Sequence, residues 1–276
     1  MALNKAPKAY SNEKFLNSPA ARTLRILAEY QEPQARFKEQ KIRDTVVFYG
    51  SARIISKKEA NKKISALKKF KNPSKQRIEE ANTALEMSRY YEETVELSRL
   101  LTEWSLKQDP GYRFVVCSGG GPGIMEASNL GAKKAGGKSI GFNISLPHEQ
   151  APNQFITPSL NFEFHYFFMR KFWFAYLAKA LVIMPGGYGT LDELFELLTL
   201  VQTQKIRKKM PVVIHDKNFW DRVLNFEELL KKRLISKKDL KLFYISESVE
   251  DAFQYLKTEL RKYYLQKPVS LFNQRS

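Results

Sequence analysis

The sequence predicts an α/β protein: a doubly wound, mostly parallel sheet with helices on both faces, plus an N-terminal helical extension. Short apolar runs alternate along the chain with longer segments in which apolar residues recur every three or four positions. That alternation is typical of strands joined by helical crossovers, the arrangement of Rossmann-like sheets. Two of the apolar runs pass directly into glycine-rich turns that begin a helix. The chain has 276 residues, of which 43% are hydrophobic, so it can bury a large core.

The expected strands are short and rich in β-branched or aromatic residues, which favour extended backbone. They lie at residues 45–49, 113–117, 139–143, 160–164, 180–183, 212–215 and 242–245. The expected helices carry apolar residues on one face. They cover residues 56–107 with a break at 72–73, a segment after 123, 166–179, 194–204, a segment from 218 onward, and 249–264.

We expect three regions along the chain. Residues 1–43 form the N-terminal helical extension, in which Pro33 interrupts the helix. Residues 44–265 form the Rossmann-like domain, with a helical insertion at about 56–108. Residues 266–276 form a C-terminal tail.

The chain is strongly basic, because 46 Lys and Arg residues against 29 Asp and Glu give a net charge of +17. A basic chain attracts polyanions. The densest run of lysines lies at residues 57–77 and contains one aromatic residue, Phe70. Nucleic-acid binding through this run is one interpretation, and a solvated helix face is the other.

Several classes of protein are excluded by what the sequence lacks. The longest apolar runs are shorter than the ~18 residues that a membrane span requires, so no membrane association is expected. The first residues lack the apolar core of a signal peptide. Cys117 is the single cysteine, which excludes an internal disulfide and fits a reducing cytoplasm. The cysteine and the three histidines do not have the spacing of a zinc site, so no metal is expected.

The stretch at residues 184–193 is the first candidate site, a strand-to-helix turn. Its glycines are Gly186, Gly187 and Gly189. Glycines let the chain approach a ligand closely, and the first turn of a helix offers unpaired N–H donors to an anion. Thr190 can add a hydroxyl to this cradle, and Glu193 places a carboxylate beside it. The combination predicts a site for a phosphorylated sugar.

Two further turns are expected at the same place. A second glycine-rich turn follows the strand at 113–117, and its glycines are Gly120, Gly121 and Gly123. Ser51 follows the first strand. The carboxyl ends of parallel strands meet at one edge of the sheet, so these turns should line one pocket. Taken singly, each glycine run also fits an ordinary tight turn, and neither is a Walker A loop because no Gly-Lys-Ser/Thr follows.

Arg170 is the other charged candidate, because it lies in the apolar and aromatic segment at 166–179. It could face Glu193 at the same edge of the sheet. Alternatively, Arg170 and Lys171 could extend to solvent or pair with Glu163.

The glycine turn with Glu193, together with the triplet Met169, Arg170 and Lys171, resembles the paired signatures of the LOG family. These are the "lonely guy" cytokinin-activating phosphoribohydrolases, long labelled possible lysine decarboxylases. Residues 118–127 and the loop at 146–153 resemble the longer bacterial branch of the family. The resemblance covers roughly residues 45–253 and leaves the N-terminal extension, the lysine-rich insertion and the tail outside the family core. No lysine lies in a context that argues for a pyridoxal phosphate Schiff base.

The resemblance implies hydrolysis of the N-glycosidic bond of a nucleoside 5′-monophosphate, AMP or an N6-modified AMP, to free base and ribose 5-phosphate. Glu193 would stabilise the positive charge that develops on the ribose and could orient the attacking water. Arg170 would keep Glu193 ionised or bind the substrate. The remaining substrate-binding candidates are Ser51, Gly120, Gly121, Gly123, Met169, Lys171, Gly186, Gly187, Gly189 and Thr190. The resemblance implies no metal or organic cofactor. It does imply a homodimer or a higher homo-oligomer.

Two other functions stay open on the sequence. One is a non-catalytic nucleotide-binding or carrier protein on the same fold, as in the molybdenum-cofactor carriers. The other is a nucleic-acid-binding module like the DNA-processing protein DprA, which the net charge of +17 motivates. The presence of both Glu193 and Arg170 favours the enzyme.

Overall fold

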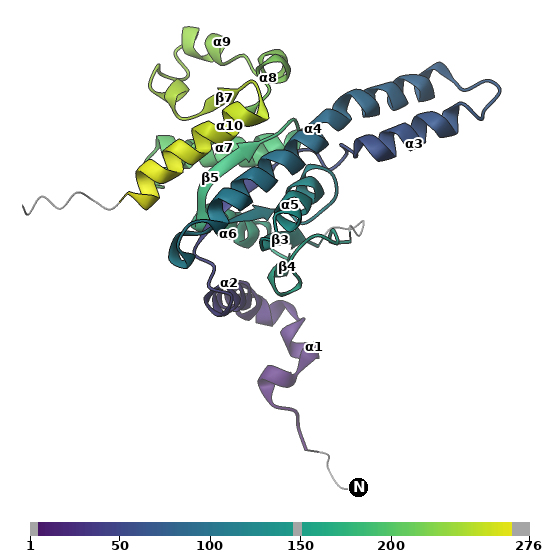
Figure 1. The fold of residues 1–276 in the computed structure, drawn as a ribbon. Coiled ribbons are helices and arrows are strands. Elements are labelled where there is room, and N and C mark those ends of the chain that lie inside the picture. Colours follow the sequence, from purple (N-terminus) through teal and green to yellow (C-terminus); the bar gives the residue numbers. More distant parts are fainter. Residues whose placement is uncertain (1–4, 146–150, 267–276) are drawn as a thin grey trace, which may run out of the picture.

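The computed structural model describes residues 5–145 and 151–266. Strands in this part of the chain form one seven-stranded sheet in the order β4-β3-β2-β1-β5-β6-β7 (Figure 1). They are β1 (Asp44–Tyr49), β2 (Phe114–Ser118), β3 (Ser139–Ile144), β4 (Asn161–Phe164), β5 (Ala178–Ile183), β6 (Val212–His215) and β7 (Tyr244–Ser246). Every neighbouring pair is parallel. The predicted α/β fold is confirmed, and each expected strand lies within about two residues of its predicted bounds.

The order of the strands reverses between β1 and β5. From β1 the chain moves outward through β2 and β3 to β4, and it then returns to β5 on the other side of β1 before moving to β6 and β7. Such a reversal separates the loops that follow the two central strands and creates a crevice at their carboxyl ends. The topology therefore predicts a ligand site where β1 and β5 end.

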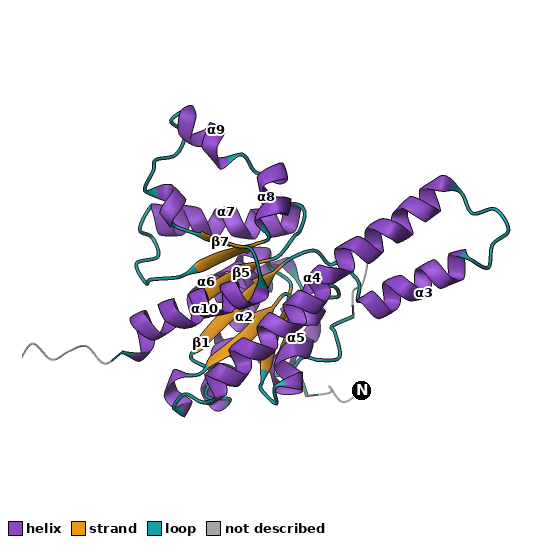
Figure 2. Ribbon diagram, turned by 45° about the horizontal axis from the view of Figure 1, so that its top comes forward, coloured by secondary structure: helices purple, strands orange, loops and turns teal. Residues whose placement is uncertain are grey.

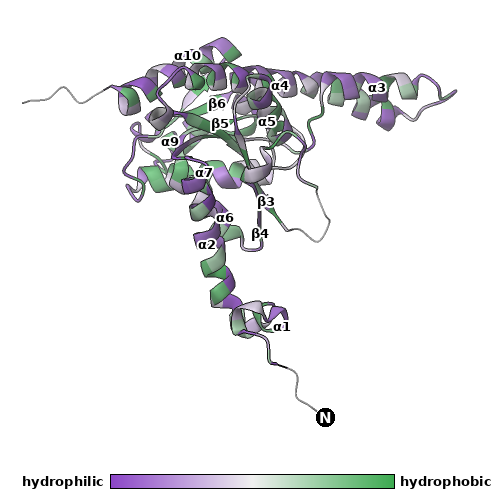
Figure 3. Cartoon of the chain, turned by 60° about the horizontal axis from the view of Figure 1, so that its bottom comes forward, coloured by the Kyte–Doolittle hydropathy of each residue, from purple (hydrophilic) through white to green (hydrophobic). Residues whose placement is uncertain are grey.

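Helices cover both faces of the sheet (Figure 2). On one face lie α4 (Lys75–Leu106), α5 (Ile124–Lys134) and α10 (Val249–Leu260), and on the other lie α2 (Arg22–Glu39), α6 (Phe167–Leu177) and α7 (Tyr188–Gln202). The central strand β1 serves both cores, because Val47 and Tyr49 pack toward α6 while Val46 and Phe48 pack toward α4 and α10. Figure 3 shows the strands as largely hydrophobic, as expected for a parallel sheet buried on both faces.

The N-terminal segment contains α1 (Glu13–Leu16) and α2. The prediction that Pro33 interrupts the helix is wrong, since α2 continues through it. Proline cannot donate a hydrogen bond to the carbonyl four residues earlier, which here belongs to Glu29. The indole Nε1 of Trp173 on α6 donates to that carbonyl instead, at 2.9 Å. A residue distant in sequence therefore replaces the missing hydrogen bond.

The predicted helical insertion is a hairpin of α3 (Lys57–Leu67) and α4, with the break between them where it was expected. The hairpin projects from the body of the molecule (Figures 1 and 3). The helix expected from residue 218 is two short helices, α8 (Lys217–Val223) and α9 (Phe226–Lys231), because the Asn225 side chain starts a second helix by accepting the N–H of Glu228 at 2.9 Å. The expected C-terminal tail lies outside the described residues from 267 onward.

Candidate active site

The three turns expected at one edge of the sheet are joined by backbone hydrogen bonds. The N–H of Ser51, after β1, donates to the carbonyl of Pro185, after β5, at 3.0 Å. The N–H of Ile124, at the start of α5, donates to the carbonyl of Ser51 at 3.1 Å. Ser51 therefore links the two glycine turns through its main chain, while its hydroxyl accepts the N–H of Arg53 at 3.1 Å.

The turn after β2 is held by side-chain amides. Asn153 donates through Nδ2 to the carbonyls of Gly120 and Gly121, at 2.9 and 3.1 Å, and to the Oδ1 of Asn129 at 2.9 Å. Gly120 has φ +76°, where other residues are strained, and a Cβ there would also collide with the amide of Asn143. These contacts give the turn a fixed shape. The neighbouring loop at 146–150, part of the resemblance, lies outside the described residues.

The turn after β5 leaves one side open. A Cβ added at Gly187 or Gly189 would meet no atom within 4 Å. The N-cap of α7 is Gly187, which supplies no side chain to the first N–H groups of the helix. Thr190 is buried and packs against Gly186, where an added Cβ would lie 2.6 Å from the Thr190 Cβ. The turn thus has main-chain N–H groups on its open side, and Thr190 packs against its other side. Accessible N–H groups at the start of a helix are what an anion site requires.

Glu193 lies in the second turn of α7 and is only 8% exposed. Burial raises the pKa of its carboxyl to about 7, while the charges of Lys171 and Arg170 act in the opposite direction. The sequence-based expectation was an ionised carboxylate maintained by Arg170. In the structure, desolvation outweighs the two cations, so this carboxyl exchanges its proton near neutral pH. A pKa in this range suits a group that takes or gives a proton during a reaction.

Arg170 is turned toward the same edge of the sheet. Its guanidinium lies 5.3 Å from the centre of the Phe174 ring and so close to Gly119 that a Cβ there would be 2.6 Å from Nη2. Burial lowers the pKa of Arg170, and the charge of Glu193 opposes that shift. It makes no ion pair within the described residues, neither with Glu163 nor with Glu193, and its buried Nε has no hydrogen-bond partner there.

Tyr49, at the end of β1, is a residue that the sequence reasoning missed. Its side chain is 6% exposed, its ring lies 5.1 Å from that of Phe174, and its hydroxyl has no partner among the described residues. Burial raises its pKa, and the nearby charge of Glu193 adds to that shift. The signal available was its position directly before Gly50 and Ser51, which puts a hydroxyl at the carboxyl end of the central strand.

Two further candidates on α6 are engaged in packing. Lys171 forms ion pairs with Asp192 at 2.7 Å and with Glu196 at 2.5 Å, along the side of α7. Met169 is buried in the core beneath α6. The structure therefore brings Arg170 to the turn after β2 and close enough to Glu193 for their charges to interact. Lys171 and Met169 fix the position of α6 against its neighbours.

Among residues 5–145 and 151–266, no group of three or more His, Cys, Asp or Glu side chains is arranged to hold a metal ion. Within the same residues, no helix is both long and apolar enough to cross a membrane.

The chain matches a family model described as "Possible lysine decarboxylase" over residues 125–256, a little under half of its length. A stretch of 77 residues is 35% identical to the cytokinin riboside 5′-monophosphate phosphoribohydrolase LOG of Oryza sativa subsp. japonica. That stretch is 28% of this chain and spans 31% of the rice protein.

Two solved structures are similar over most of the chain. The structural genomics target TM1055 is 21% identical with a TM-score of 0.47, covering 78% of this chain and 99% of that one. The molybdenum cofactor binding protein of the phototrophic bacterium Rippkaea orientalis is 18% identical with a TM-score of 0.46, covering 79% and 98%. Neither similarity assigns a function.

Proposed function

Because the family match and the partial relative support placing this chain in the LOG family, we propose that it is a phosphoribohydrolase that cleaves a nucleoside 5′-monophosphate. Its products are the free base and ribose 5-phosphate. The observation that carries this proposal is a buried carboxyl with a pKa of about 7, Glu193, in the second turn of the helix whose open glycine turn can bind a phosphate.

The phosphate of the substrate binds the main-chain N–H groups at the start of α7, around Gly187 and Gly189. This contact anchors the ribose with its C1′ toward Glu193. As the bond between C1′ and the base breaks, positive charge builds on the ribose ring, and the ionised carboxylate stabilises it. Glu193 then accepts a proton from the water that adds to C1′ and afterwards releases it to solvent. The nitrogen of the departing base, which was bonded to C1′, takes up a proton from solvent. Binding energy from the phosphate is used to hold the sugar in place.

Arg170 has a separate task in this scheme. Its guanidinium faces the turn after β2 at Gly119 and has an unpartnered buried Nε, so it can donate hydrogen bonds to the ribose hydroxyls or to the phosphate. Its charge also lowers the pKa of Glu193 and favours the ionised form.

The test is release of base from AMP, with ribose 5-phosphate measured in parallel. We expect Glu193→Gln and Arg170→Ala to lower kcat by at least about a hundredfold with the fold retained, as loss of a general base or charge-stabilising group does. Glu227→Gln, which removes an exposed carboxylate on α9, is the matched control and should be unchanged. Activity within a few-fold of wild type in either site variant contradicts the assignment.

Adenosine separates the phosphate contact from the chemistry. It should be a far poorer substrate than AMP, because it lacks the group that the glycine turn binds. Equal turnover of both would remove the role of that turn. A panel of AMP, N6-modified AMP, GMP and pyrimidine monophosphates then identifies the base, and tight binding without base release would favour a carrier.

We further propose that the protein acts as a homodimer. Several large aromatic side chains are exposed on α6 and α7, around Lys171 and Glu196. They are Phe167, Phe168, Phe172, Tyr176 and Phe195, and we call them the aromatic patch. Exposed aromatic side chains on neighbouring helices are typical of an association surface, and we propose that a second copy of the chain covers this one. The substrate class and the single buried thiol, Cys117, fit a cytoplasmic setting.

A further inference from the structure

The hairpin of α3 and α4 extends beyond the sheet (Figures 1 and 3). The helix α4 has 32 residues and is therefore about 48 Å long. Its second half packs on α5 and the sheet, whereas its first half has only α3 beside it. Between Lys75 and Met87, Ala81 is the one fully buried residue. The core of the enzyme does not require this extension.

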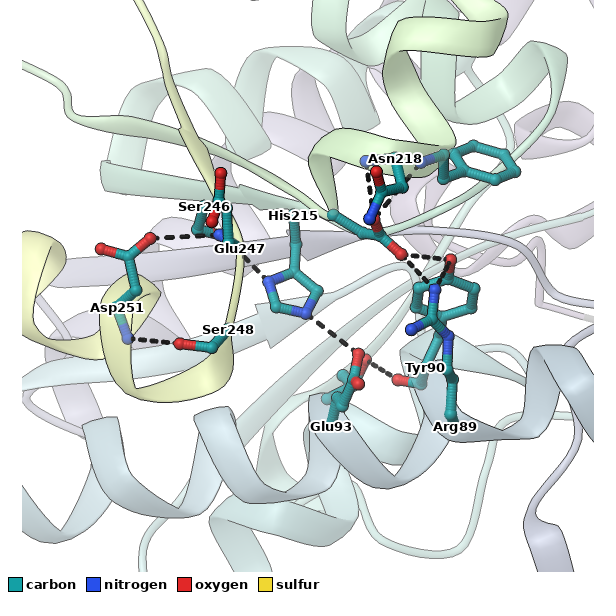
Figure 4. A network of polar contacts seen from close by, with 12 residues as sticks. Arg89, Tyr90, Glu93, His215, Asn218, Ser246, Glu247, Ser248 and Asp251 are labelled. Carbon is teal, nitrogen blue, oxygen red and sulfur yellow. Dashed lines mark hydrogen bonds and ion pairs between the residues drawn. The ribbon is translucent and has the colours of Figure 1, made fainter.

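The root of the hairpin is held by buried polar contacts (Figure 4). The Tyr90 hydroxyl donates to Asp216 at 2.5 Å, and Arg89 pairs with the same carboxylate. One turn further along α4, Glu93 contacts Nε2 of the buried His215 at 3.0 Å, and Nδ1 of that ring contacts the Ser246 hydroxyl at 2.9 Å. Because His215 at the end of β6 and Asp216 directly after it hold α4 here, the direction of the hairpin is fixed.

The outer surface of the hairpin is basic. Nine lysine and arginine side chains lie between residues 57 and 77, all exposed: Lys57, Lys58, Lys62, Lys63, Lys68, Lys69, Lys71, Lys75 and Arg77. Glu59 is the single acidic residue in the same segment. None of the nine makes an ion pair with a described residue, whereas Lys171, Lys179 and Lys217 elsewhere do. The nine cations of this surface are therefore free to pair with an external anion.

The arrangement of these charges favours an extended polyanion. On α3 the buried Ala60 faces α4, so Lys58 and Lys62, one turn apart, lie on the opposite side toward solvent. At the tip, Phe70 is 56% exposed among lysines, with the Arg77 guanidinium 5.9 Å from its ring. Unpaired cations beside an exposed aromatic ring are the elements that bind single-stranded nucleic acid, through phosphates and base stacking.

We propose that the basic part of this hairpin, residues 57–77, binds the phosphate backbone of a single-stranded nucleic acid, with Phe70 stacking on a base. The hairpin begins at the same edge of the sheet as the glycine turns, since α3 follows β1 after a short loop. Binding there would hold the protein on the polymer without occupying the nucleotide pocket. The proposal is independent of the hydrolase activity.

The test is fluorescence anisotropy of a labelled oligo(dT) or oligo(U), about 20 nucleotides long so that it exceeds one binding site. It is measured with the full chain at several salt concentrations. Replacing Lys58, Lys62, Lys68 and Lys69 by Glu should weaken binding at least tenfold. It should also make the slope of log K against log salt shallower by about 3, at roughly 0.7 for each lost phosphate contact. Phe70→Ala should weaken binding by about fivefold or more with little change in slope.

The matched control replaces Lys231, Lys232, Lys237 and Lys238, exposed residues remote from the hairpin, by Glu. It carries the same change in net charge and should bind as wild type does. Equal losses in both quadruple variants would overturn the proposal, since net charge alone would then explain binding. So would absence of binding by the wild type, or hairpin-dependent binding to phosphatidylserine vesicles without binding to the oligonucleotide. Base release from AMP should be unchanged in the hairpin variant, so failure here is distinct from failure of the hydrolase proposal.

Discussion

The burial of Glu193 disfavours the ionised form of its carboxyl group, and the pH dependence of the reaction should show the raised pKa. Burial raises its pKa to about 7. If the ionised form acts, kcat/KM for AMP rises roughly tenfold per pH unit below about 7 and levels off above it, because that ratio follows the free enzyme. The profile is measured from about pH 5.5 to about pH 8.5. A flat profile would show that another group carries the reaction.

Glu193 should lower the free energy of unfolding at neutral and higher pH, where its buried carboxyl must ionise. Its folded-state pKa of about 7 lies above its ordinary value of 4.5, so the folded protein holds a proton that the unfolded chain has lost between these two values. Stability from this group is therefore complete at low pH and is lost as the pH rises through 7. Relative to wild type, Glu193→Gln should gain roughly 2–3 kcal/mol between about pH 5 and about pH 8. Urea unfolding at both pH values measures this, and a difference that is independent of pH would contradict the burial argument.

Replacement of Tyr49 tests whether its buried hydroxyl takes part in the reaction. Its buried hydroxyl lacks a partner among the described residues, so Tyr49→Phe should leave stability unchanged or raise it by about 1 kcal/mol. If the hydroxyl binds Glu193 or the ribose during the reaction, kcat falls about tenfold while KM changes little. Thermal unfolding and steady-state kinetics on one preparation separate the two effects. Full activity in this variant would assign the hydroxyl no role.

At the scale of elements, local sequence was enough to predict most strands and the two glycine turns. Strand β6 lies at its predicted residues, 212–215, because three β-branched residues follow Pro211 and precede His215. What local sequence could not show were contacts between distant residues. The Trp173 indole, which donates a hydrogen bond to the Glu29 carbonyl, lies 144 positions after Glu29 in the sequence. The Asn153 amide, which donates to the Gly120 carbonyl, lies 33 positions after Gly120. The position of Glu193 was predictable from its turn, whereas its raised pKa depends on its burial, which the packing of distant segments determines.

The turn after β2 can be tested through Gly119. A Cβ there would lie 2.6 Å from Arg170 Nη2 and from Met125 Sδ, both far ends of flexible side chains. Gly119→Ala should therefore cost little stability while displacing the guanidinium, and we expect base release to fall at least tenfold. Gly111→Ala, where the added Cβ meets only Arg43 at 3.7 Å, is the control for alanine replacement. Wild-type activity in Gly119→Ala would mean that Arg170 need not stay where the structure places it.

For the whole molecule, the aromatic patch leads to a prediction about assembly. Phe168→Glu with Tyr176→Glu places two charges in the patch, and the dimer we propose should dissociate to monomers, as measured by sedimentation velocity at micromolar concentration. Ile78→Glu with Phe70→Glu, on the hairpin, is the matched control and should leave the assembly unchanged. A wild type that is monomeric at these concentrations would remove the proposal.

The main-chain links through Ser51 have an evolutionary implication. The groups that we propose to bind the phosphate are main-chain N–H groups of the turn after β5, which Ser51 joins to the turn after β2, whereas the carboxyl that we propose to react belongs to one side chain. Chemistry and retention of the nucleotide can then be inherited separately. A descendant in which glutamine replaced Glu193 would bind the nucleotide without cleaving it and could store or carry it. A single replacement would produce that protein, and the fold would be retained.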